Sequence, residues 1–165
     1  MAVRRGVPGR QCRLITDLTA MPRPKISPGT ADDIEAAFYD ALLHGDVPRL
    51  MECWADEDDI VCLLPGGSRL VGHAAIRAAF ETLFAHGGLK VHPERVRRIE
   101  AGTCSVHNVI ERLDVMGNDG PTSAWVVATN VYAKTVHGWR IVTHHASPGS
   151  EDDPRDSLGP STLLH

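Results

Sequence analysis

The second half of the chain alternates apolar and polar residues in long segments that are separated by short turns. This alternation predicts strands over residues 89–100, 104–116, 123–135 and 139–147. Each connection contains glycine, and the connection over 117–121 also contains asparagine, aspartate and proline. Long strands joined by such short turns form an antiparallel, strongly curved sheet. Any fold for this chain must be built around that sheet.

The first half carries the signals of helices. Thr30 and Asp33 form a capping box, and apolar residues follow it at the spacing of an amphipathic helix. These residues are Ile34, Ala37, Phe38, Ala41 and Leu42. Gly45 is placed to end this helix, and Asp46 can cap a second, short helix that leads to Trp54.

Two short apolar runs, 60–64 and 69–71, flank a Pro-Gly-Gly turn and predict a hairpin. A third helical pattern follows over 76–84 and stops at a glycine pair. Helices followed by a strand meander define an α+β fold. We expect the three N-terminal helices to cover one face of the curved antiparallel sheet, which encloses a cone that holds side chains or a ligand.

Charge divides the chain into three parts. Residues 1–25 hold six basic residues and one acidic residue, a net charge of +5, so the rest carries −9 of the total of −4. We therefore expect a basic, irregular or disordered arm over 1–28, a domain over 29–149 and a loose acidic tail over 150–165. The first twenty residues belong to a native arm or lie upstream of a start at Met21. An acidic domain argues against nucleic acid as a partner.

The four cysteines form no Cys-x-x-Cys pair and have no metal-finger spacing. Cys53, Cys62 and Cys104 stand among apolar residues and are typical of small core side chains in a reducing compartment. No apolar run is long enough to span a membrane, and the arm lacks the pattern of a secretory signal. We expect a cytoplasmic protein that does not associate with membranes.

Several stretches, taken in order, resemble the NTF2-like superfamily and, within it, the SnoaL-like, DUF4440-type small proteins. They are 38–46 ending in His-Gly-Asp, 50–54, 60–67, 70–77, 128–132 and the closing Gly-Trp-Arg-Ile-Val-Thr-His-His-Ala-Ser-Pro. The resemblance covers about residues 30–149 and implies a cone-shaped α+β fold and a homodimer. It leaves the function open, because this fold hosts isomerases, dehydratases, cyclases, hydrolases and binding modules.

Two positions depart from the ketosteroid isomerases of this superfamily. The resemblance places Phe38 where those enzymes have a tyrosine that stabilises an oxyanion, and Leu64 where they have the general base. A steroid-isomerase mechanism is therefore not expected.

The closing strand supplies the candidate catalytic residue. Regular alternation puts Trp139, Ile141, Thr143, His145 and Ser147 on one face, so we expect His145 to line the cone as an acid or base. The alternative is a histidine at a solvated strand end. His144 would face the other way, so the pair cannot ligate one metal ion, and we expect neither metal nor cofactor.

Four further residues are candidates for ligand binding. Asn130 could orient a ligand carbonyl, and Glu111, among apolar residues, could act as a base. Trp54 and Asp59 are expected at the pocket mouth. Each has a plainer alternative: a bulge asparagine, an outward-facing carboxylate, a core tryptophan and a solvated acidic turn.

Three functions remain open. The first is a cofactor-independent lyase, isomerase or hydrolase that acts on a hydrophobic carbonyl compound through His145. The second is a non-catalytic ligand-binding domain, and the third is a protein-interaction adaptor tethered by the basic arm. An apolar sheet face opposite Asn130, assigned to Trp125, Val127, Val131 and Val109, predicts a homodimer through the sheets.

Overall fold

The computed structural model describes residues 29–117 and 119–150. The predicted arm over 1–28 and most of the predicted tail over 150–165 lie outside these residues. The helices are α1 (Ala31–His44), α2 (Val47–Glu52) and α3 (His73–Leu83). The strands are β1 (Val61–Leu63), β2 (Arg69–Val71), β3 (Val91–Ala101), β4 (Cys104–Gly117), β5 (Gly120–Thr135) and β6 (Gly138–Pro148).

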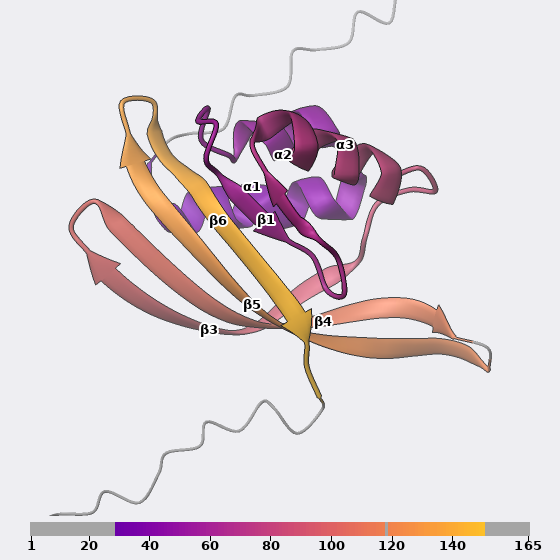
Figure 1. The fold of residues 1–165 in the computed structure, drawn as a ribbon. Helices are drawn as coiled ribbons and strands as arrows, with labels where there is room; N and C mark the ends of the chain where they lie inside the picture. Colours follow the sequence, from indigo (N-terminus) through magenta and orange to yellow (C-terminus); the bar gives the residue numbers. More distant parts are fainter. Residues whose placement is uncertain (1–28, 118, 151–165) are drawn as a thin grey trace, which may run out of the picture.

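The six strands form one curved sheet in the order β2-β1-β6-β5-β4-β3 (Figure 1). The three helices lie on one side of it, which we call the inner face, and the opposite side is the outer face. This confirms the predicted α+β fold. One pairing differs from the expected antiparallel sheet, because β1 runs parallel to β6 and makes the sheet mixed.

The capping residue and the glycine that the sequence predicts for the first helix are found at the two ends of α1. Thr30 Oγ1 accepts a hydrogen bond from the Asp33 backbone N–H, and Gly45 ends the helix in the left-handed conformation, with φ of 64°. The backbone N–H of Leu89 then donates to the Leu42 carbonyl at 2.7 Å. Gly88 packs so closely here that a Cβ would stand 2.1 Å from the Leu43 carbonyl oxygen. These contacts fix α1 across the inner face.

A β-bulge in β6 decides which side chains face inward. Tyr132 of β5 pairs with Ile141, whereas the preceding Val131 pairs with Thr143, so Val142 is an extra residue in β6. An extra residue reverses the alternation beyond it. Ile141 and His144 are therefore both buried on the inner face, although they are three residues apart.

The core lies between the helices and the inner face, and it is packed with side chains from both. Burial decreases along the strands toward the β4–β5 turn: Val109 is buried, Leu113 is half-buried and Met116 is exposed. Figure 1 shows the ends of β4 and β5 projecting beyond the helices. None of the helices within the described residues is long and apolar enough to cross a membrane.

Candidate functional site

A row of polar side chains crosses the inner face at the level of α1. His107 of β4, Asn130 of β5 and His144 of β6 lie directly opposite one another, and all three are buried. Neighbouring strands are about 4.8 Å apart, so adjacent members of such a row are in contact. Buried polar groups cost free energy unless they are paired. This row is therefore the first candidate for a site.

His144 and Asn130 form one half of the row. His144 Nδ1 donates to Asn130 Oδ1 at 2.6 Å, because a carboxamide oxygen can only accept. Burial, reinforced by the charge of His145, lowers the pKa of His144 to about 4. The His144 ring also packs against Phe38, with centroids 5.5 Å apart. His144 is thus a neutral imidazole at pH 7, and its Nε2 carries the lone pair.

Glu35 of α1 organises the other half. Its Oε2 accepts hydrogen bonds from His107 Nδ1 and, at 3.3 Å, from the Tyr132 hydroxyl. Arg98 Nη2 stands 4.0 Å from the same carboxylate. His107 Nε2 is buried without a hydrogen-bond partner among the described residues, and the nearest carboxylate oxygen, on Glu100, is 3.8 Å away. This half of the row therefore contains one buried nitrogen atom, His107 Nε2, that has no hydrogen-bond partner among the described residues.

Glu111 and Tyr39 form a second inner pair. The Tyr39 hydroxyl donates to Glu111 Oε1 at 2.7 Å. Burial raises the pKa of Glu111 to about 7, with a further rise from Glu35, while the bond from Tyr39 opposes the increase. Burial and the Glu111 carboxylate raise the pKa of Tyr39 well above its usual value. Glu111 therefore occupies both protonation states near neutral pH.

Glu111 also lies at the edge of the core. It is the last buried residue of β4 before Leu113 is half-buried and Asp114 is exposed. The facing residue on β5 is Val126, which is likewise the last buried residue before the exposed end of that strand. Glu111 therefore lies at the boundary between the packed core and the exposed ends of β4 and β5.

Two of the predicted site residues, Asn130 and Glu111, are buried on the inner face, where they belong to different hydrogen-bonded groups. The expected inward direction of His145 is wrong, because the bulge at Val142 turns His144 inward and leaves His145 exposed on the outer face. The catalytic role of His145 stays a prediction. Asp59 is exposed in the loop before β1. Val109, expected on the outer face, is buried on the inner face beside Glu111.

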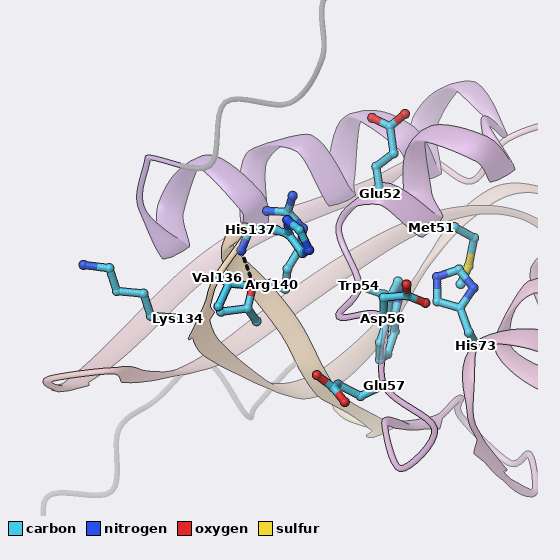
Figure 2. A pocket seen from close by; sticks show the side chains of 11 residues that line it. Met51, Glu52, Trp54, Asp56, Glu57, His73, Lys134, Val136, His137 and Arg140 are labelled. Carbon is cyan, nitrogen blue, oxygen red and sulfur yellow. Dashed lines mark hydrogen bonds between the residues drawn. The ribbon is translucent and has the colours of Figure 1, made fainter.

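Trp54 lies elsewhere, in the wall of a groove of about 950 Å³ at the start of β6 (Figure 2). Its side chain is 2% exposed, and its Nε1 is buried without a hydrogen-bond partner among the described residues. The groove is separate from the Glu111 cluster, since the two share no residue. Within the described residues, no group of three or more His, Cys, Asp or Glu is placed to hold a metal ion.

Three residues of the inner groups, Glu35, Tyr39 and Tyr132, are not among the residues predicted for the site. Glu35 and Tyr39 are four residues apart on α1 and so share one side of the helix, next to the apolar stripe. The four-residue spacing of Glu35 and Tyr39 could have indicated that both polar side chains face the sheet. The resemblance to isomerases directed attention to Phe38, whereas the hydroxyl that reaches the site belongs to the next residue.

The chain belongs to the SnoaL-like domain family, whose sequence profile matches residues 32–151. No curated protein matches the chain. A solved structure from Thiobacillus denitrificans, named for the association domain of calcium/calmodulin-dependent protein kinase type II, is 32% identical with a TM-score of 0.67. The match covers 74% of this chain and 97% of that one.

Two further solved structures are similar. A protein of the NTF2-like family from Streptomyces avermitilis, named as a dehydratase, is 26% identical with a TM-score of 0.63, over 70% of this chain and 91% of that one. A ketosteroid isomerase-like protein from Erwinia carotovora atroseptica is 16% identical with a TM-score of 0.59, over 72% and 93%. Because the identity to the Erwinia protein is only 16%, this similarity shows a shared fold and nothing about function.

Proposed function

We propose that the chain binds a small, hydrophobic carbonyl compound between α1 and the sheet and moves a proton on it, with Glu111 as acid and base. The observation that carries this proposal is the buried Glu111 carboxyl group, whose pKa of about 7 suits it to accept and return a proton at neutral pH. The name of the Streptomyces avermitilis relative, a dehydratase of the NTF2-like family, is consistent with proton-transfer chemistry.

Each inner residue has a role in this proposal. Glu111 would take a proton from the carbon next to the carbonyl group, and the Tyr39 hydroxyl holds the carboxylate in place at 2.7 Å. The neutral His144 imidazole, fixed through Nδ1 by Asn130, offers Nε2 as an acceptor for a hydroxyl group of the ligand. Phe38 and Val109 supply apolar contacts around these groups.

Hydrogen exchange tests the proposal without knowledge of the net reaction. Small ketones, aldehydes and thioesters are incubated with the protein in D2O, and loss of the proton beside the carbonyl is followed by NMR. We expect exchange to be accelerated by the protein and to fall by about a hundredfold or more in Glu111→Gln. The matched control is His145→Ala, on the outer face, which should exchange as the unaltered protein does.

Two results would contradict the assignment. If Glu111→Gln exchanged as fast as the unaltered protein, Glu111 would not be the base. If His145→Ala lost exchange while His144→Ala kept it, the chemistry would lie on the outer face, as the regular alternation of β6 predicted.

A second function is assembly, and a separate observation favours it. The relative from Thiobacillus denitrificans is named for an association domain, and within residues 29–117 and 119–150 no helix covers the outer face. Ile99, Val106 and Val131 lie opposite one another across β3, β4 and β5 on that face, and Ile99 is 66% exposed. A row of apolar side chains of this kind is typical of an interface.

The expected assembly is a homodimer through the outer faces, and light scattering after gel filtration measures it. Val131→Lys should convert the dimer to a monomer, because a charge would be buried in the interface. Leu83→Lys is the control, since Leu83 lies on α3 and is 39% exposed. A monomeric unaltered protein, or a dimer that persists in Val131→Lys, would contradict this proposal.

A further inference from the structure

A second row of side chains crosses the outer face, closer to the end of β6 than the proposed interface row around Val131. Arg95, Ile110, Val127 and Ser147 lie directly opposite one another across β3, β4, β5 and β6, and we call them the Val127 row. Ile110 and Val127 are half-buried, although no helix in the described part of the chain covers this face (Figure 1). The row is therefore a strip of apolar surface that begins at the end of β6 and stops at an arginine.

The β3 end of the Val127 row is positively charged. Arg95 and Arg97 are two residues apart on β3, so both point to the outer face, and both are exposed. Two neighbouring carboxylates, of Glu94 and Asp114, are held by Arg112, whose Nε donates to Glu94 at 2.9 Å. An acidic segment that crossed the row would therefore gain favourable charge interactions at this end.

The chain itself continues from the other end of this row. After β6, the Gly149 backbone N–H donates to the Trp125 carbonyl at 2.8 Å, so the chain leaves the sheet beside β5. Residues 151–165 follow, and they hold four acidic residues and one arginine, a net charge of −3 with histidine uncharged. The same segment contains three leucines, Leu158, Leu163 and Leu164. Its composition thus complements a row that is apolar along its length and cationic at its end.

We propose that residues 151–165 bind across the outer face of their own chain along the Val127 row, with their carboxylates against Arg95 and Arg97. The reach is sufficient, because β6 and β3 are three strand spacings apart, about 14 Å, and six extended residues span about 20 Å. The leucines of the segment then cover Ile110 and Val127. A tethered segment has a high effective concentration at the row, so individually weak contacts hold it there.

This proposal is separate from the two functions proposed above. The inner groups around Glu111 lie on the other face of the sheet. The interface row around Val131 is four residues further along β5 than Val127, a distance of about 13 Å. Binding of the segment and assembly therefore use different parts of the outer face, and each can fail alone.

NMR of the backbone amides tests the proposal by comparing the whole chain with a chain shortened by residues 151–165. We expect the signals that differ to lie in 95–97, 108–112 and 125–129, which border the Val127 row. A synthetic peptide of the removed segment, added at millimolar concentration, should return the signals of the shortened chain toward their positions in the whole chain. Raising the ionic strength from about 0.05 M to about 0.5 M should weaken peptide binding, because salt screens exposed charges.

Charge variants give the second readout. A peptide whose four acidic residues are replaced by their amides should bind the shortened chain about tenfold more weakly than the acidic peptide. The double variant Arg95→Gln with Arg97→Gln should weaken binding of the acidic peptide about fivefold, because each exposed ion pair has a small effect. The matched control, Arg69→Gln with Lys90→Gln, removes two exposed cations elsewhere and should bind as the unaltered shortened chain does. Circular dichroism checks that each variant is folded.

Three results would overturn the proposal. The first is the absence of any difference in outer-face signals between the whole and the shortened chain. The second is equal binding of the acidic peptide and its amide form, because the charges would then have no role. The third is a dimer of the Val131→Lys variant that is lost when residues 151–165 are removed, because the segment would then bind a second copy. A monomeric whole chain contradicts the assembly alone, since the NMR comparison is made equally well on a monomer.

Discussion

Replacing Glu111 by glutamine should make the protein more stable at neutral pH, and the effect should disappear in acid. Folding raises the pKa of this carboxyl group from 4.5 to about 7, chiefly through burial. At 1.36 kcal/mol per pH unit, this rise corresponds to about 3 kcal/mol. The amide of Glu111→Gln cannot ionise, and its oxygen can still accept the hydrogen bond from Tyr39.

The sign follows from proton counting. Between pH 4.5 and 7 the folded state holds a proton on Glu111 that the unfolded state has lost, so the free energy of unfolding falls as pH rises. Below pH 4.5 the carboxyl group is protonated in both states, and the effect is absent. We therefore expect Glu111→Gln to match the unaltered protein near pH 4 and to exceed it by about 3 kcal/mol at pH 8.

Urea unfolding at a series of pH values measures this difference. The comparison with the variant is essential, because His144 works in the opposite direction over nearly the same range. Its pKa falls from 6.5 to about 4 on folding, so its contribution to stability is lost as pH falls. Glu81→Gln, at an exposed position on α3, is the control. A stability difference between Glu111→Gln and the unaltered protein that is constant from pH 4 to 8 would refute the reasoning.

Three other substitutions test neighbouring contacts. His144→Gln should lose the acid-dependent part of the stability, so that urea unfolding shows a gap to the unaltered protein that changes by about 3 kcal/mol between pH 6.5 and 4. Tyr39→Phe should raise the pKa of Glu111 above about 7, because the hydrogen bond that favours the carboxylate is gone; NMR titration of the Glu111 carboxyl carbon measures it. Gly88→Ala should destabilise the fold by about 1–3 kcal/mol in urea, because the new Cβ would overlap the Leu43 carbonyl oxygen.

The fold could be predicted because its signals are local. The capping box at Thr30, the stripe of α1 and the glycine at its end each act within a few residues, and the structure follows them. The same holds for the turns between the four long strands. The parallel pairing of β1 with β6 joins segments about eighty residues apart, and neither short segment carries a pattern that specifies its partner.

The site was less predictable, because one extra residue in β6, Val142, determines whether His144 or His145 faces inward. Period-2 alternation assigns His145 to the face of Ile141, and it holds only while the strand is regular. A bulge depends on how two strands fit together, so β6 alone could not reveal it. Alternation alone also left open which face of β4 and of β5 lies inward, and only the packing of α1 against the sheet shows that Asn130 and Glu111 are on the inner face. Their roles in ligand binding stay predictions.

Removal of the bulge residue tests this account of the site directly. With Val142 deleted, Ile141 pairs with Tyr132 and Thr143 with Val131 in consecutive positions, so β6 becomes regular without moving either histidine to the other face. We expect the deletion variant to fold and to keep the His144–Asn130 hydrogen bond. Diethyl pyrocarbonate, which modifies accessible imidazoles, should then label His145 and spare His144, as in the unaltered protein. Labelling of His144 rather than His145 in the unaltered protein would contradict the assignment of His144 to the inner face. Reversed labelling in the deletion variant alone would show that β6 does not keep its register with β5 after the deletion.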